Sequence, residues 1–221
     1  MARRRPDPPS SRARLLAAAR REFAARGFDG AKVDRIAARA RVNKAMLYYH
    51  FRNKAALYRA ILHELFHGVA EAVTAVRAAG GTPDAQLRRF IEAVARKGIE
   101  QPDFPGVWLR EMADGGRHLD AVIVVEFQRV LGVLAAILAD GRRQGAFRDT
   151  NPFVTHLGIV APLLFFAATA PMRRRFAGLG LAGLDPAPDL FIAHVQHTTL
   201  AALAPAGAGA GARPADSRTR R

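Results

Sequence analysis

Apolar residues recur every three or four positions along most of the chain, which is the spacing of one face of an α-helix. The first such face carries Leu16, Ala19 and Phe23. It follows a serine, at position 10 or 11, whose side-chain oxygen can accept from a free backbone N–H. Gly27 comes next and is a common helix terminator. The pattern therefore predicts a first helix between these serines and Gly27.

Two short helices and one long helix are predicted after Gly27. Residues 33–40 carry a short apolar face, and a tight break then leads to Asn43, a good cap for a helix over 44–50. Asn53 can cap a long fourth helix whose apolar stripe covers 57–73. Short helices joined by a tight break are the local pattern of a helix-turn-helix.

The remainder of the chain shows only helical periodicity. The Gly-Gly-Thr-Pro sequence at 80–83 is the clearest linker, and Pro162 is expected to kink or interrupt the helix that contains it. Further helices are predicted at 87–94, 107–113, 119–143, 152–170 and 189–203. No strand pattern competes, so the sequence predicts an all-α fold of about nine helices.

Both ends of the chain are of low complexity. Residues 1–9 are basic and interrupted by prolines, which indicates a flexible arm, and 205–221 is an Ala/Gly tail ending in arginines, which predicts disorder. Between them we expect a first domain at 10–70, with its helix-turn-helix at about 32–51, and a second helical domain at 71–204.

The charge of the chain is concentrated near its N-terminus. The net charge is +15, and residues 1–60 contain 16 lysines and arginines against 4 acidic residues. The remaining residues contain 18 against 15. This asymmetry indicates a polyanion partner for the first quarter of the chain and an uncharged role for the rest.

Composition excludes several classes of site. The chain has no cysteine, which excludes disulfides, thiolate metal sites and cysteine nucleophiles and is compatible with a reducing cytoplasm. No apolar run follows the N-terminal arginines, so no secretory signal is expected. The longest uncharged apolar stretch, 156–172, contains two prolines and is short for a membrane span, so a buried interface is predicted there instead of a membrane contact.

Residues 27–57 carry the chemistry expected of a DNA reader. The third helix has a small, polar first turn, Lys44-Ala45-Met46, that can enter the major groove. The tyrosines that follow can offer hydroxyls to phosphate. The start of the fourth helix adds free N–H groups and Lys54, which together predict a phosphate contact.

This stretch resembles the N-terminal signature of the TetR (tetracycline-repressor) family of transcription regulators. The matching positions are Gly27-Phe28, Ile36-Ala37, Ala40, Val42, Lys44, Leu47, Tyr48, Phe51, Lys54 and Leu57. Two positions depart from the family pattern. Lys32 stands where Ser or Thr usually caps the second helix, and Arg41 stands where the turn usually has glycine, which is unfavourable if that position needs a positive φ.

The resemblance implies a homodimer that holds double-stranded operator DNA and responds to a small effector, with no cofactor, no metal and no enzymatic activity. Lys44, Ala45, Met46 and His50 would face bases, with the tyrosines and Lys54 on the backbone, while Leu47 and Phe51 would pack inside. The full set of predicted DNA-binding residues is Lys32, Asp34, Asn43, Lys44, Ala45, Met46, Tyr48, Tyr49, His50 and Lys54.

The second domain is expected to hold an uncharged or weakly anionic hydrophobic effector between its helices. The predicted lining residues are Phe104, Trp108, Met112, Phe127, Leu131, His156, Phe165 and Phe166, with Arg110 and Glu111 as polar anchors. The helices at 152–170 and 189–203 are expected to form the dimer interface as a four-helix bundle, because the first of them is apolar around most of its circumference. In the implied mechanism the effector moves the sensor helices, and the fourth helix carries the movement to the DNA-binding domain.

Two other functions are compatible with parts of the sequence. His63-Glu64-Leu65-Phe66-His67 spells the H-E-x-x-H pattern of zinc peptidases, in which both histidines bind zinc and the glutamate activates water. No downstream third-ligand motif follows, so packing on a connecting helix is the favoured interpretation. A nonspecific nucleic-acid-binding protein would share the basic N-terminal part but has no need of the apolar second domain.

Overall fold

The computed structural model describes residues 10–205, which form nine α-helices and no strand. The helices are α1 (Ser11–Gly30), α2 (Val33–Ala40), α3 (Lys44–Phe51), α4 (Lys54–Ala78), α5 (Pro83–Glu100), α6 (Phe104–Ala113), α7 (Ala121–Arg143), α8 (Pro152–Gly178) and α9 (Pro188–Leu203). The predicted all-α fold is confirmed. The predicted basic arm 1–9 and nearly all of the predicted tail lie outside the described residues.

Side-chain caps begin the helices at the predicted residues. Ser10 accepts from the N–H of Ala13 at 3.2 Å, Asn43 from Ala45 at 2.9 Å, and Asn53 from the third residue of α4 at 2.8 Å. Gly27 interrupts α1 with a φ of 69°, so the regular helix ends where the sequence indicates. The starts of α1, α3 and α4 are therefore encoded locally.

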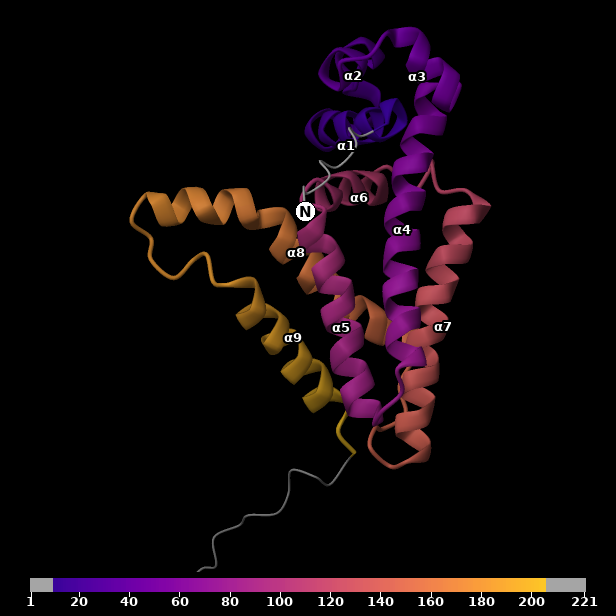
Figure 1. The fold of residues 1–221 in the computed structure, drawn as a ribbon. Helices are drawn as coiled ribbons and strands as arrows, with labels where there is room; N and C mark the ends of the chain where they lie inside the picture. The colour runs from indigo at the N-terminus through magenta and orange to yellow at the C-terminus, as the bar shows by residue number, and fades with distance from the viewer. Residues whose placement is uncertain (1–9, 206–221) are drawn as a thin grey trace, which may run out of the picture.

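Helix α8 is longer than predicted. It continues through Pro171 to Gly178, although proline cannot donate to the preceding turn. Side chains bind the carbonyls just before this proline: the hydroxyl of Thr169 donates to Phe165 O at 2.8 Å, and Arg173 donates to Phe166 O. These bonds add side-chain contacts to the turn before the proline, whereas the backbone bond that Pro171 cannot make is the one to the carbonyl of Ala167. Figure 1 shows α8 bent, with its later turns reaching away from the other helices.

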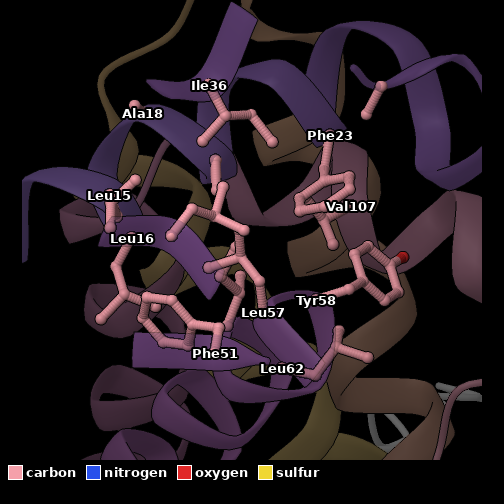
Figure 2. Close-up of a cluster of buried hydrophobic side chains, with 14 of the residues drawn as sticks. Leu15, Leu16, Ala18, Phe23, Ile36, Phe51, Leu57, Tyr58, Leu62 and Val107 are labelled. Atoms are coloured by element: carbon pink, nitrogen blue, oxygen red, sulfur yellow. The ribbon is translucent and has the colours of Figure 1, made fainter. Parts of the chain in front are cut away.

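Two clusters of buried side chains share α4. The first joins α1, α2, α3 and the start of α4, and Figure 2 shows Phe23, Leu57 and Tyr58 within it. The second joins the later part of α4 to α5, α7, α8 and α9. We call α1–α3 with residues 54–62 of α4 the head, and the remaining helices with the rest of α4 the body. In Figure 1 the head lies at one end of the long helices of the body.

Helices α7 and α8 are long and apolar enough to cross a membrane by length and composition alone. From the sequence, the stretch 156–172 is short for a membrane span, whereas the helix that contains it, α8, is longer than that stretch. Helix α7 packs along α4 and α5 and contains the buried carboxylate of Glu126, as a core helix does. Helix α8 packs against α5, α7 and α9 on one side but leaves large apolar side chains exposed on the other, including Val154, Leu157 and Phe165. That exposed side is a candidate interface.

Candidate nucleic-acid interface

Helix α3 has one buried side and one exposed side. Leu47 and Phe51 are buried in the core of the head, as predicted. Tyr49 is 81% exposed and Tyr48 is 46% exposed, and Lys44 and Ala45 in the first turn are exposed as well. Met46 is half-buried beside them. The exposed side therefore presents a cation, a small residue and two phenols to the surroundings of the molecule.

An ion pair links the first turns of α2 and α3. The ammonium of Lys44 lies 2.8 Å from a carboxylate oxygen of Asp34, and both side chains are largely exposed. The hydrogen bond and the charge of Asp34 raise the pKa of Lys44 above its usual value. An exposed pair of this kind contributes little to stability, so a phosphate or base edge can replace Asp34 as the partner of Lys44.

The helix-turn-helix is held against α1 by a buried carboxylate. Glu22 of α1 accepts from the guanidinium of Arg35 at 2.6 Å and from the N–H of Lys32 at 3.4 Å. Burial raises the pKa of Glu22, but these bonds and the nearby arginines outweigh burial, so the pKa is lowered overall. Lys32 itself provides no side-chain cap for α2, as its residue type predicts. Glu22 therefore satisfies a backbone donor at the start of α2.

Lys54 contacts backbone carbonyls of the head, and its predicted contact with phosphate stays a prediction. Its ammonium donates to the carbonyl of Phe28 at 2.9 Å and to that of Ala31 at 3.3 Å, and it lies 4.4 Å from the centre of the Phe28 ring. The side chain is half-buried. Because its donors already face carbonyls at the end of α1 and the loop that follows, Lys54 fixes the start of α4 to α1.

His50 is also engaged inside the protein. Its Nε2 lies 2.7 Å from the hydroxyl of Ser11, and the ring is half-buried between α3 and α1. A base contact would require this hydrogen bond to break. In the free protein His50 therefore helps to hold α3 against α1, and its predicted position facing bases stays a prediction.

Two exposed arginines at the ends of α3 adopt positive φ angles. Arg41, in the turn before α3, has φ 53° and ψ 48°, so the position does require the left-handed conformation that makes arginine unfavourable there. Arg52, directly after α3, has φ 62°. Arg52 is not among the predicted DNA-binding residues, and no local sequence signal marks it. Together they place a guanidinium at each end of the exposed side of α3.

A cavity of about 590 Å³ lies in the body between α5, α8, α9 and the first residues of α6. This volume is in the usual range for small-molecule sites. Its walls are mostly apolar and include Val94, Ile99, Phe104, Leu163, Phe166 and Phe191. The charged side chains in its lining are Asp103, Arg173, Arg174 and Asp185.

Most of the residues predicted to line an effector site do not line this cavity. Phe104 and Phe166 line this cavity, whereas Trp108, Met112, Phe127, Leu131, His156, Phe165, Arg110 and Glu111 do not. Trp108 packs edge-on against Phe66, with ring centres 4.9 Å apart. Phe165 is 67% exposed on the outer side of α8. The pattern of apolar residues identified helix faces, but tertiary packing decides which of these faces line a cavity.

The H-E-x-x-H residues do not form a peptidase site. His67 Nδ1 lies 2.9 Å from a carboxylate oxygen of Glu126, and His63 Nε2 lies 3.8 Å from the same atom. Glu64, which would have to activate water, is paired with Arg12 and Arg20 of α1. Within residues 10–205 no three histidine or acidic side chains form a group able to hold a metal. Leu65 is buried, in keeping with packing on a connecting helix.

Helix α6 connects the cavity to the head. Its first residues, Phe104 and Pro105, line the cavity, and Val107 is buried in the core of the head beside Phe23 and Tyr58 (Figure 2). Arg110, one turn further, donates to the carbonyl of Ala24 in the later part of α1. A single short helix therefore contacts both regions.

The loop after α6 also contacts the head. Arg117 lies 2.7 Å from the carboxylate of Asp29, and the ring of His118 lies 4.1 Å from that of Phe28, measured between centres. His118 is in turn held by the buried carboxylate of Glu111, which accepts from its N–H at 2.7 Å. These contacts attach the end of α1 to the body.

Two family models match the chain. The model of bacterial regulatory proteins of the tetR family matches residues 15–61, and that of the tetracyclin repressor-like C-terminal domain matches residues 83–183. Between them they match more than half of the chain. The first match contains the whole helix-turn-helix, and the second contains all of α5, α6 and α7 and most of the cavity lining.

Curated proteins with similar sequences are transcription regulators. The HTH-type transcriptional repressor SCO4008 of Streptomyces coelicolor is 29% identical over 184 residues, which cover 83% of this chain and 92% of the relative. The HTH-type transcriptional repressor NicS of Pseudomonas putida is 26% identical over 159 residues, covering 71% of this chain and 74% of the relative.

Solved structures with the same fold are also regulators of this kind. A tetR-family regulatory protein from Rhodococcus RHA1 superposes with a TM-score of 0.74 at 21% identity, covering 89% of this chain and 98% of that one. The regulator PfmR of Thermus thermophilus gives a TM-score of 0.68 at 23% identity, covering 87% and 97%. Taken with the helix-turn-helix geometry and the two family models, these similarities show that the chain belongs to the TetR family and is a DNA-binding regulator of transcription, not an enzyme.

Proposed function

We propose that the protein is a homodimeric repressor that reads a palindromic operator with the exposed side of α3. Lys44, Ala45 and Met46 contact base edges in the major groove, because the first turn of α3 is exposed and carries no bulky side chain. Tyr48 and Tyr49 contact the sugar-phosphate backbone. The repressor role is supported by the relatives SCO4008 and NicS, both named as repressors.

The predicted neighbours of α3 complete this interface. Lys32 and Asp34 flank it on α2, and Asn43 begins it with an oxygen that already caps the helix. Arg41 and Arg52 are added as phosphate contacts, because both are exposed at its ends. The proposal depends mainly on one observation: α3 has a buried side that packs in the core of the head and an exposed side that is free to contact DNA.

Regulators of this family act as dimers on DNA operators. We assign the dimer interface here to α8 and α9. Val154, Leu157, Ala161 and Phe165 follow one another at helical spacing on the outer side of α8 and are all exposed. Helix α9 adds small and polar exposed residues, His197 among them. Two copies related by a twofold axis would cover both sides as a four-helix bundle and place two α3 helices in successive major grooves.

We further propose that a small apolar effector enters the cavity and releases the DNA through α6. An effector between α5, α8 and α9 contacts Phe104 and Pro105 at the start of α6, and α6 contacts α1 through Val107 and Arg110. A shift of α6 therefore moves the head relative to the body. Helix α4 belongs to both clusters of buried side chains and shares this coupling.

Selection of bound sequences from random duplex DNA tests the DNA-reading role. We expect the wild-type protein to select an inverted repeat and Met46→Ala to change the preferred base at one position of each half-site. Each lost base contact corresponds to about 1–3 kcal/mol of discrimination. Tyr49→Phe is expected to weaken binding to all sequences by the same factor, because a backbone contact carries no base information.

The matched control for this experiment is Arg142→Gln, which removes an exposed arginine at the end of α7 that is outside the head. This variant should select the same sequence as the wild type with the same affinity. If Lys44→Ala and Met46→Ala also select the wild-type sequence with unchanged affinity, α3 does not read the bases.

A further inference from the structure

Arg173 places a cation in the wall of the otherwise mostly apolar cavity. Its side chain is only 14% exposed. The carbon at the centre of its guanidinium lies 3.8 Å from the centre of the Phe166 ring, and Nη1 donates to the carbonyl of Phe166 and, at 2.7 Å, to the hydroxyl of Thr169. These contacts all come from α8 itself. They fix the orientation of the guanidinium without neutralising its charge.

The carboxylate nearest to Arg173 is a loose partner. Asp185 lies on the segment between α8 and α9, with a carboxylate oxygen 3.4 Å from Nε, and its side chain is 33% exposed. Nε is buried but makes no hydrogen bond to any of the described residues. A buried cation whose nearby carboxylate is not hydrogen-bonded to it is incompletely compensated, so this site favours an additional anion.

The other charged side chains of the cavity lining have less need of a ligand. Asp103 is half-exposed at the start of α6, and Arg174 is exposed. Water can solvate both groups, whereas it has little access to Arg173. A ligand with an amine could pair only with the more exposed carboxylates of the lining, Asp103 and Asp185. It would also place a second positive charge close to Arg173. The balance of burial therefore favours a ligand with a negative charge.

We propose that the effector is an organic acid with one carboxylate and an apolar body, and that Arg173 binds the carboxylate. The proposal rests on the effector role of the cavity proposed above and specifies its ligand. Arginine matches a carboxylate through parallel N–H donors, and such charge-assisted hydrogen bonds are stronger than neutral ones. The apolar body lies against Leu163, Phe166 and Phe191, which line the same cavity. Asp185 then competes with the ligand for Arg173.

Calorimetric titration of the full chain with matched probes tests the proposal. One set is dodecanoate, dodecanol and dodecylamine below their micelle concentrations, and a second is phenylbutyrate, phenylbutanol and phenylbutylamine. We expect the carboxylate of at least one set to bind about tenfold or more tightly than its alcohol and amine, as a charge-assisted hydrogen bond predicts. Arg173→Gln should remove this preference, and Arg173→Lys should retain part of it.

Three further variants separate the possible explanations. Arg175→Gln removes an exposed arginine of α8 that does not line the cavity, and it should leave binding unchanged. Asp185→Asn should tighten carboxylate binding several-fold, because it removes the competitor while leaving Arg173 in place. Ala167→Trp fills the cavity and should abolish binding of every probe. Circular dichroism identifies any variant that fails to fold.

Several results would overturn the proposal. These are an alcohol or an amine that binds as tightly as its carboxylate, a carboxylate preference that survives Arg173→Gln, weaker carboxylate binding by Asp185→Asn, or no binding by any probe. Operator binding and its release are measured separately. If an alcohol binds, is blocked by Ala167→Trp and releases DNA, the effector role of the cavity stands and only its preference for acids is wrong. If the protein binds no specific DNA, the proposed function fails whatever the probes do.

Discussion

Arg41, next to the exposed side of α3, has a left-handed backbone conformation that is unfavourable for arginine. A residue with a Cβ atom loses about 1–2 kcal/mol in the left-handed region relative to the right-handed one, and glycine avoids this cost. The guanidinium of Arg41 is exposed, so nothing in the head compensates by burying it. Under the proposed function, the compensation is a contact with DNA phosphate.

Replacement of Arg41 by glycine should therefore increase stability and weaken DNA binding. We expect the free energy of unfolding of Arg41→Gly to rise by about 1 kcal/mol, measured by urea denaturation at a fixed protein concentration. Arg39→Gly makes the same change of charge within α2, where glycine should instead lower stability by about 1 kcal/mol. Lower stability of Arg41→Gly would mean that the turn does not carry the strain assigned to it.

His156 is expected to make stability depend on pH. The ring is buried in α8, edge-on to Phe127, and burial lowers its pKa below the usual value. The unfolded chain therefore binds the proton more readily than the folded one. The stabilising effect of neutral His156 is complete above the unfolded pKa of about 6.5 and is lost as the pH falls below it.

The His156→Phe variant should remove this contribution. Urea denaturation at a series of pH values from 8 down to about 5 should show a smaller loss of stability for the variant than for the wild type. His156→Gln, which is polar but does not titrate in this range, should show the same flatter profile. Parallel profiles for all three proteins would show that His156 does not titrate differently in the folded state.

At the scale of single residues, the sequence predicts what depends on neighbours along the chain. Asn43 and Asn53 cap their helices as predicted because an N-cap bonds to an N–H two or three residues away. The hydrogen bonds of Lys54 could not be predicted from its neighbours along the chain. Its acceptors, Phe28 and Ala31, are more than twenty residues away and meet it only after the head has folded.

At the scale of helices, the sequence does not indicate that α6 links the cavity to the head. The sequence predicts a helix at 107–113 that carries effector-lining residues such as Trp108 and Met112, but the implied mechanism assigns coupling to the fourth helix alone. The contacts of α6 with α1 and with the cavity depend on where the tertiary fold places it. The predicted end of α8 is also wrong. This helix continues through Pro171 to Gly178, which no simple helix-stop rule indicates.

A disulfide between α1 and α6 tests the coupling role of α6. A Cβ atom built on Gly106 lies 3.7 Å from the Cβ of Ala24, which is suitable for a disulfide, and the chain contains no other cysteine. The oxidised Ala24→Cys/Gly106→Cys protein should bind operator DNA but should not release it when a cavity ligand is added. Reduction should restore release.

The two single-cysteine variants are the controls for this experiment. Each should release DNA as the wild type does, whether oxidised or reduced. Release of DNA by the oxidised double variant at the wild-type ligand concentration would show that α6 does not have to move relative to α1. Ligand binding to the locked protein, measured by calorimetry, separates loss of coupling from loss of the site.

At the scale of the whole molecule, the exposed apolar side of α8 requires a partner surface. Leu157→Asp places a charge at this side and should shift the protein from dimer to monomer in sedimentation experiments, because a buried unpaired carboxylate opposes association. Val125→Asp is the matched control, since Val125 is 53% exposed on α7 and lies outside the proposed interface. Dissociation of both variants, or of neither, would contradict the assignment to α8 and α9.

Under the proposed function, a dimer reads a palindromic operator through two copies of α3. Hydroxyl-radical footprinting of the wild-type protein on its selected sequence, in competition with random duplex DNA at physiological salt, tests it most directly. We expect two protected segments related by a dyad, with centres about 34–36 Å apart or a multiple of that spacing, at protein concentrations that leave random DNA unbound. Protection that spreads evenly along any duplex, with no advantage over random DNA, would contradict it and indicate a nonspecific nucleic-acid-binding protein.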